Sequence, residues 1–325
     1  MCQGHPPDFR PHTGGKDWAR CFGVNLNGNI SDDIHLMEIR RIFVPLFGSE
    51  NDNITLSTAF AVAKQLKAHA DVYFVCEQTS GTLPYLGIGE YLTPDVDEAF
   101  KRQVATEAHQ AATEARETFQ RLCAELEIEE VQEPRGPGTP STRLQTIVGH
   151  AEIILPRLVR LSDMGVFSGP FRHNHLAPNL LEKTLLGSGR PLLFTPWQSI
   201  AEGLKKVAIG WNGSAPVARA VLAAQPFLKQ AERIDVLYVS DDTPDVAPAQ
   251  QLVEYLSWHG LQSRDHALQR NETETGQTLL DAACELNADL FVMGAYAHNW
   301  YEEIVLGGTT RFVLENTQIP LFVMH

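Results

Sequence analysis

Cysteine is scarce in this 325-residue sequence, and the few copies are scattered. They lie at five positions without metal-ligand spacing, namely Cys2, Cys21, Cys76, Cys123 and Cys284. Secreted proteins that depend on disulfides carry paired cysteines, whereas free thiols are typical of a reducing compartment. The sequence therefore predicts neither a disulfide framework nor a metal site, and it favours the cytoplasm.

Positive charge and long apolar runs are also in short supply. The chain has 26 Lys and Arg against 40 Asp and Glu, a formal net charge of -14. Binding to nucleic acid or anionic lipid by bulk electrostatics needs clustered Lys and Arg, and no such cluster appears along the sequence. Apolar stretches such as 288–293 fall far short of the ~20 residues that cross a bilayer. We therefore expect no nucleic-acid partner, no membrane partner and no transmembrane helix.

Residues 1–36 are rich in Gly, Pro, His, Asn and Asp and show no apolar periodicity. Such a composition predicts a disordered N-terminal extension. The extension also lacks the basic start and apolar stretch of a secretory leader, which again favours the cytoplasm. Met37 precedes the first strand pattern, and the sequence leaves open whether it is an internal residue or a second start.

What the sequence does contain is an internal repeat. Residues 40–49, RRIFVPLFGS, correspond to residues 205–214, KKVAIGWNGS: two basic residues, an apolar strand and a Gly-Ser turn. An Ala-rich helical pattern and a second strand follow in each copy, and both copies close with a Pro and an apolar strand. The repeat predicts a first domain over 37–197 and a second over 203–325, a division that suits this length.

Short apolar strands alternate with helices in both halves, which predicts an α/β fold of two tandem doubly wound, Rossmann-like parallel sheets of five strands each. The closing strands, 192–194 and 321–323, are too apolar to remain uncovered edges. We expect them to meet in an internal pseudo-dimer. Dimerisation of whole chains stays open.

The segment most suggestive of binding follows the fourth strand of the second half, where MGAYAHN at 293–299 precedes LGGTTR at 306–311. Gly307 and Gly308 would leave backbone N–H groups uncovered at the start of a helix. A helix N-terminus favours anions, because its first amides are unpaired and the dipole is positive there. Phosphate is the ligand that this pattern predicts.

This segment resembles the universal stress protein family, whose motif is a Gly, two residues, a Gly, nine residues, then a Gly followed by Gly, Ser or Thr. The match falls at Gly294, Ala297, Gly307 and Gly308, and the similarity extends over 38–325. The resemblance implies a nucleotide-binding fold like that of the adenine nucleotide alpha hydrolases. The residues that it implies for the adenine nucleotide are Gly210, Trp211, Asn212, Val239, Met293, Gly294, Tyr296, Ala297, His298, Gly307, Gly308, Thr309 and Thr310.

Two positions of the second half depart from the family pattern. Asn212 stands where the family usually has Asp, so an acceptor is kept but the charge is lost. Ala297 replaces the second motif glycine, which costs on the order of 1 kcal/mol if that position needs positive φ.

The first half departs further, because Ser168, Pro178 and Asn179 take the places of Gly294, Gly307 and Gly308, and Phe47 takes that of Asn212. We interpret it as a structural partner without a phosphate loop. The Leu-Gly-Ser-Gly run at 186–189 is expected to be a helix C-cap.

No catalytic set emerges. Glu302 and Glu303 suit a solvated helix face, His173 and His175 lack partners at ligand spacing, and Cys284 is expected in the core. The resemblance thus implies a stress-related regulatory protein whose second domain binds ATP or another adenine nucleotide, with Mg²⁺ as a candidate companion and with no ligand if Ala297 abolishes binding. The alternatives are a weak ATP hydrolase or adenylyl transferase, and a ligand-free scaffold for unknown protein partners.

Overall fold

The computed structural model describes residues 38–77, 94–134, 136, 138–169, 178–196, 203–240, 249–269, 274–295 and 308–325. The predicted disordered extension, 1–36, lies outside these residues and stays a prediction. Residues 37–325 form one compact unit. We refer to 38–196 as the first half and to 203–325 as the second half; the division of the chain into two domains also stays a prediction.

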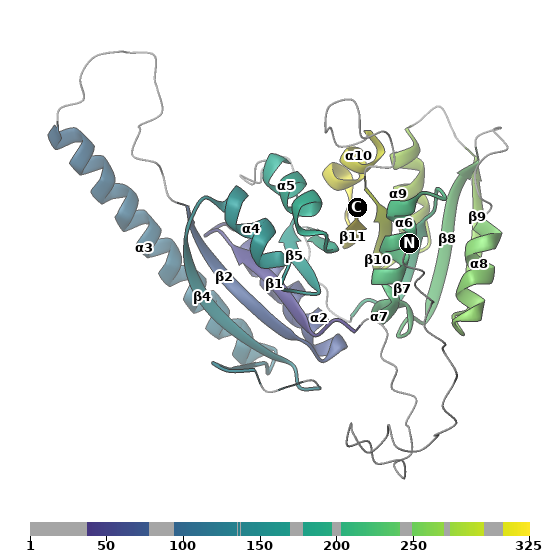
Figure 1. Ribbon diagram of the computed structural model, residues 1–325, viewed down its shortest axis with the longest axis horizontal. Coiled ribbons are helices and arrows are strands. Elements are labelled where there is room, and N and C mark those ends of the chain that lie inside the picture. Colours follow the sequence, from purple (N-terminus) through teal and green to yellow (C-terminus); the bar gives the residue numbers. More distant parts are fainter. Residues whose placement is uncertain are drawn as a thin grey trace, which may run out of the picture. The chain divides into compact units, whose positions relative to one another are not determined.

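Each half alternates strands with helices, as the repeat predicts (Figure 1). The first half consists of β1 (Arg41–Leu46), α2 (Asp52–Leu66), β2 (His69–Glu77), α3 (Pro94–Glu125), β3 (Glu129–Glu130), β4 (Ser141–Gly149), α4 (Ala151–Val159), β5 (Met164–Ser168), α5 (Pro178–Ser188) and β6 (Leu192–Thr195). The second half consists of β7 (Lys206–Gly210), α6 (Ala215–Ala223), α7 (Gln225–Leu228), β8 (Arg233–Ser240), α8 (Ala249–Trp258), β9 (Arg264–Gln269), α9 (Thr275–Glu285), β10 (Leu290–Gly294), α10 (Gly308–Asn316) and β11 (Leu321–Met324).

The strands form a single 11-stranded sheet in the order β3-β4-β2-β1-β5-β6-β11-β10-β7-β8-β9. Neighbours within each half are parallel, which confirms the doubly wound α/β fold. The closing strands β6 and β11 pair antiparallel and join the two predicted sheets into one. Leu193 lies opposite Phe322, its own counterpart in the repeat, so the junction has pseudo-two-fold symmetry. The predicted internal pseudo-dimer is confirmed.

The core forms one layer on each side of this sheet, and each layer runs through both halves. One layer unites α2, α3, α6 and α8, with Phe60, Phe119 and Val221 among its buried members. The other unites α4, α5, α9 and α10, with Leu155, Leu280 and Val313. Helices cover both faces of a parallel sheet, so its strands are buried on both sides. The strands of this chain accordingly carry apolar residues on both faces.

An aspartate anchors the first strand of each half. Asp163, just before β5, accepts hydrogen bonds from the backbone N–H groups of Arg40 (2.8 Å) and Arg41 (2.9 Å). Asp289, just before β10, accepts from those of Lys205 (3.3 Å) and Lys206 (2.9 Å). The same bond at the same place in both halves confirms that Asp163 aligns with Asp289 and that the starts of the two first strands correspond.

Two smaller expectations have different outcomes. Gly189, at φ +65°, follows α5 directly, so the 186–189 run is a helix C-cap as predicted. The prediction that Cys284 is a core residue is wrong, because its side chain is exposed. The buried stripe of α9 runs through Leu279, Leu280 and Ala283, and the next position has already turned toward solvent.

No helix in the described ranges is both long enough and apolar enough to cross a membrane. The 32-residue helix α3 has the length, but charged residues recur along it from end to end.

Candidate nucleotide site

The predicted site residues gather at the carboxyl ends of β7, β8 and β10. Strand β7 lies between β10 and β8, and the register places Met293, Gly210 and Leu237 side by side. The next strand along the chain, β8, lies on one side of β7, and the later strand β10 lies on the other side, so the strand order reverses at β7. In open α/β sheets ligands bind in the crevice at such a switch point.

Packing explains two of the glycines at this edge. A Cβ atom on Gly294 would lie 2.4 Å from the backbone nitrogen of Val217, so the start of α6 closes on the end of β10. A Cβ atom on Gly210 would lie 2.9 Å from the ring of Phe291. Both strand ends therefore stay free of side chains next to the crevice.

The turn after β7 contains donors without a partner. The Trp211 N–H donates to the carbonyl of Leu237 (2.8 Å), and the exposed Asn212 accepts at Oδ1 from the N–H of Ser214 (3.1 Å). Gly213 lies at φ +71°. Within the described residues, the N–H groups of Asn212 and Gly213 have no hydrogen-bond partner, and Ser214 Oγ is buried without one. The sequence analysis missed Ser214; the Asn-Gly-Ser turn was the available signal.

Helix α10 supplies a second set of donors. Its first residue, Gly308, is exposed, and a Cβ atom there would meet nothing within 4 Å. Thr309 is half-buried and Thr310 is buried, and the first turn contains no acidic side chain. Its positive end is therefore uncompensated by a carboxylate of its own first turn, which suits an anion.

The remaining predicted residues divide into two groups. Met293 is buried in β10, and Val239 in β8 is half-buried against the layer of α9 and α10. Tyr296, Ala297, His298 and Gly307 lie outside the described residues, so their roles stay predictions. The same holds for Glu302 and Glu303, and for His173 and His175. Nowhere in the described ranges do three His, Cys, Asp or Glu side chains gather as a metal site would require.

The first half fills the corresponding turn with its own carboxylate. Asp52 accepts hydrogen bonds from the N–H groups of Phe47 (3.1 Å) and Gly48 (2.8 Å) and from Ser49 Oγ (2.8 Å). Burial raises the pKa of the Asp52 carboxyl, while these three donors oppose the rise. Ala111 of α3 closes the turn further, because its Cβ lies 2.8 Å from where a Cβ on Gly48 would be.

An extra helical turn brings Asp52 into this position. Between the halves the turn glycines Gly48 and Gly213 differ by 165 positions, but the matching buried patterns of the helices, Leu56-Ala59-Phe60 and Val217-Ala220-Val221, differ by 161. The first half therefore has four more residues here, about one turn of helix. Helix α2 begins at Asp52 as a result, and the equivalent of this carboxylate is missing from the second half.

The other predicted departures of the first half fit this picture. Ser168 is buried at the end of β5, where the second half has Gly294. Pro178 is the first residue of α5, and proline has no N–H to offer an anion.

No protein-family model matches this chain, and none of the curated proteins does. Solved structures do. A universal stress protein from Archaeoglobus fulgidus DSM 4304 has a TM-score of 0.63 and 17% identity, over 88% of this chain and 96% of its own. A universal stress protein in complex with cAMP has a TM-score of 0.30 and 19% identity, over 38% of this chain and 97% of its own. A member of that family from Burkholderia pseudomallei has a TM-score of 0.27 and 18% identity, over 37% and 95%.

The Archaeoglobus match spans nearly the whole of both chains. The fold is therefore that of a tandem universal stress protein, and the resemblance inferred from the sequence is confirmed at the level of the fold.

Proposed function

We propose that the second half binds one adenine nucleotide, with ATP as the leading candidate, and that the chain is a stress-related regulatory protein of the cytoplasm rather than a dedicated catalyst. One observation carries the proposal. The turn that Asp52 fills in the first half keeps three unpaired donors in the second, within the described chain. The complex of another universal stress protein with cAMP accords with an adenine ligand.

Different described residues would bind different parts of the nucleotide. Gly210, Trp211 and Asn212 would face the nucleoside, since they end the central strand. The exposed start of α10 would bind phosphate oxygens through its backbone amides and the hydroxyl of Thr309. Mg²⁺, where it accompanies the nucleotide, would be held largely by the phosphates and water.

Isothermal titration calorimetry of the full chain with ATP, with and without Mg²⁺, tests the proposal. We expect one site per chain. Gly308→Asp should abolish binding, because it places a carboxylate where the phosphates lie, and its exposed position should leave the fold intact. Asn179→Asp is the matched control, because it introduces the same carboxylate at the corresponding place in α5.

Two sites per chain, or equal affinity of the wild type and Gly308→Asp, would contradict the proposal. The absence of heat with ATP, ADP, AMP and cAMP would favour the ligand-free scaffold instead. Release of inorganic phosphate from ATP above background, lost in Gly308→Asp, would favour the hydrolase.

A further inference from the structure

Helix α4 presents an unusual exposed stripe on the first half. Ile153 is 52% exposed and Leu161, just beyond the helix, is 71% exposed. Arg157 and Arg160 are exposed between them. At the α-helical period the spacing of these four residues, 0, 4, 7 and 8, corresponds to one face; α4 ends at Val159, and the Leu161 N–H donates to the carbonyl of Leu158 (3.1 Å) in the turn that follows. The stripe, Ile153-Arg157-Arg160-Leu161, is thus apolar at both ends and basic in the middle, over about 12 Å at 1.5 Å per residue.

Two further arginines, Arg41 and Arg190, lie beside the C-terminal end of this stripe. Arg190 donates from Nε and Nη2 to the carbonyl of Arg160 (3.3 and 3.2 Å), and Arg41 donates from Nη1 to that of Leu161 (3.1 Å). Arg160 itself donates from Nε to the carbonyl of Gly187 (2.9 Å). These bonds hold the guanidinium groups in fixed positions while N–H groups of Arg160 and Arg190 keep no partner among the described residues.

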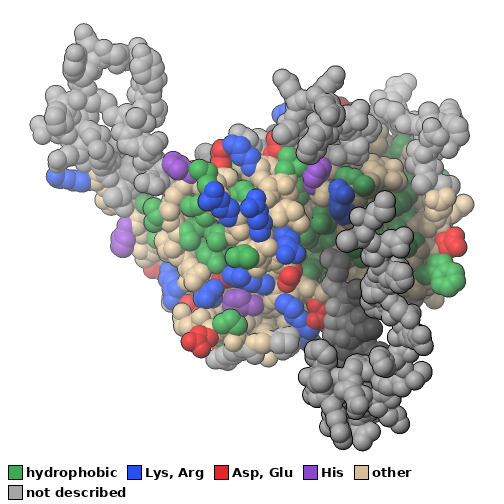
Figure 2. Space-filling model, viewed as in Figure 1, with side chains coloured by type: hydrophobic (Ala, Val, Ile, Leu, Met, Phe, Trp, Pro, Cys, Tyr) green, Lys and Arg blue, Asp and Glu red, His purple; other side chains and the backbone are tan. Residues whose placement is uncertain are grey.

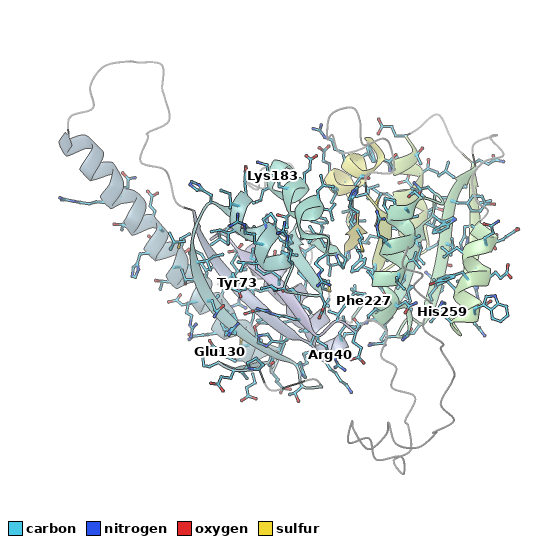
Figure 3. The ribbon with its side chains drawn as sticks, in the orientation of Figure 1. Arg40, Tyr73, Glu130, Lys183, Phe227 and His259 are labelled. Carbon is cyan, nitrogen blue, oxygen red and sulfur yellow. The ribbon has the colours of Figure 1, made fainter. Side chains whose placement is uncertain are left out.

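Carboxylates do not balance this group. Asp71 is fully buried and accepts hydrogen bonds from Arg41, Arg143 and the hydroxyl of Tyr73, so its single negative charge is already shared by two arginines. Glu152 pairs with Lys183 of α5 (Figure 3). In the described part of the chain, no acidic side chain forms an ion pair with Arg157, Arg160 or Arg190. Figure 2 shows this face, where Lys and Arg side chains gather around hydrophobic ones on a chain of net charge -14.

The fold does not require such a surface. Helix α9 takes the place of α4 in the second half and contains neither Lys nor Arg; its exposed side includes Asp281 and Glu285. Arginines near a helix C-terminus gain a little from the helix dipole. That gain explains the charge at the end of α4, but it leaves the exposed Ile153 and Leu161 unexplained.

We propose that the α4 stripe is a docking surface for an acidic segment of another protein, one that carries apolar residues on either side of its carboxylates. Arginine binds carboxylates through paired N–H groups, and it is enriched at protein interfaces. Apolar side chains at both ends call for apolar partners, which a polynucleotide does not offer.

A labelled helical peptide that mirrors the stripe provides the test, with two leucines eight residues apart and two glutamates between them. Fluorescence anisotropy with the full chain should show saturable binding that weakens with added salt. The double substitution Arg157→Glu, Arg160→Glu should lower the affinity roughly tenfold or more, because it replaces attraction by repulsion. Leu161→Ser should lower it by a smaller factor and should not change the salt dependence.

Lys229→Glu is the matched control, because it reverses an exposed charge in the second half and should leave the affinity unchanged. A version of the peptide with serines for leucines should bind less tightly than the original. The proposal is overturned if the peptide fails to bind, if the double variant binds it as well as the wild type, or if single-stranded oligo-dT or phosphatidylserine vesicles bind in its place with the same dependence on Arg157 and Arg160.

Discussion

The first and second halves of the chain begin their sheets alike and finish their first strands differently. In both, an aspartate before the fourth strand binds the backbone at the start of the first strand. After that strand, the first half adds a helical turn whose Asp52 binds the turn amides, while the second half leaves them without a partner in the described chain. The four additional residues of the first half thus account for the contrast. They supply a carboxylate that hydrogen-bonds its turn, whereas the turn of the second half keeps its donors for a ligand.

A second contrast lies at the opposite ends of the strands. Asp71 and Asp235 occupy the same place in β2 and β8, and both are buried. Asp71 has two arginines and a tyrosine, whereas Asp235 has Arg233 and His266. Around this aspartate the first half therefore has one more arginine than the second, and Arg41, one of the pair, also donates to the carbonyl of Leu161 in the α4 stripe. We infer that the two halves have divided their work: a ligand crevice in one and a protein-facing surface in the other.

The largest expected effect lies where the halves meet. Leu193 and Phe322 lie opposite each other in β6 and β11 and are fully buried, and Phe322 also packs edge to face against Phe227. Lys at both positions should cost several kcal/mol, because each ammonium would be buried without a partner. We expect separation of the halves or aggregation, measured by small-angle scattering and by the thermal midpoint.

Val148→Lys is the control for that variant, because Val148 is also a strand residue but is 68% exposed. It should change the midpoint little. A double variant that keeps the compact shape and the stability of the wild type would contradict the continuous sheet.

The glycines of the second half should separate folding from binding. Gly294→Ala would bring a methyl to 2.4 Å from the Val217 nitrogen, so we expect a loss of about 1 to 3 kcal/mol in the free energy of unfolding along with weaker nucleotide binding. Gly308→Ala meets open space and should preserve stability, yet it should also weaken binding by crowding the phosphates. Urea unfolding and calorimetry on both variants measure the two effects. Equal stability of Gly294→Ala and the wild type would show that the edge can relax.

Asp52→Ala should destabilise the first half without creating a second site. It leaves two backbone amides and a hydroxyl without their acceptor; because these groups are only partly buried, the cost should be about 1 kcal/mol, the lower end for such a loss. Ser168 and Pro178 still interrupt the phosphate side, so the nucleotide stoichiometry should stay at one per chain. Binding of a second nucleotide to this variant would mean that the carboxylate alone keeps the first half closed.

The sequence predicted the architecture because apolar strands and Ala-rich helices repeat in register along the chain. Contacts that form only in the folded chain could not be predicted from the sequence. The Ala-rich helical pattern that follows the first strand of the second half breaks into α6 and α7, because Pro226 lacks the N–H that a continuous helix needs. The extra turn that begins at Asp52 precedes the apolar pattern of α2 and carried no periodic signal. The arginines around α4 come from separate elements, so the sequence contains no run of basic residues that would have indicated a basic surface.

The smallest effect is a pH dependence confined to the first half. His69, the first residue of β2, contacts Ser141 Oγ through Nδ1 (2.9 Å), whereas its counterpart in the second half is Arg233. Burial lowers the pKa of His69 below 6.5; nearby Arg143 and Arg41 act in the same direction, and Asp71 opposes them.

The unfolded chain therefore binds a proton on His69 more readily than the folded chain does. The contribution of neutral His69 to stability is fully present above about pH 6.5 and is lost as the pH falls through the folded-state pKa. The loss should be under about 1 kcal/mol, because the ring is only half-buried and solvent screens its charge. His69→Gln can keep the bond to Ser141 without titrating. Urea unfolding of the wild type and this variant between neutral and mildly acidic pH should show the wild type losing more stability, and parallel curves would exclude His69 as the source.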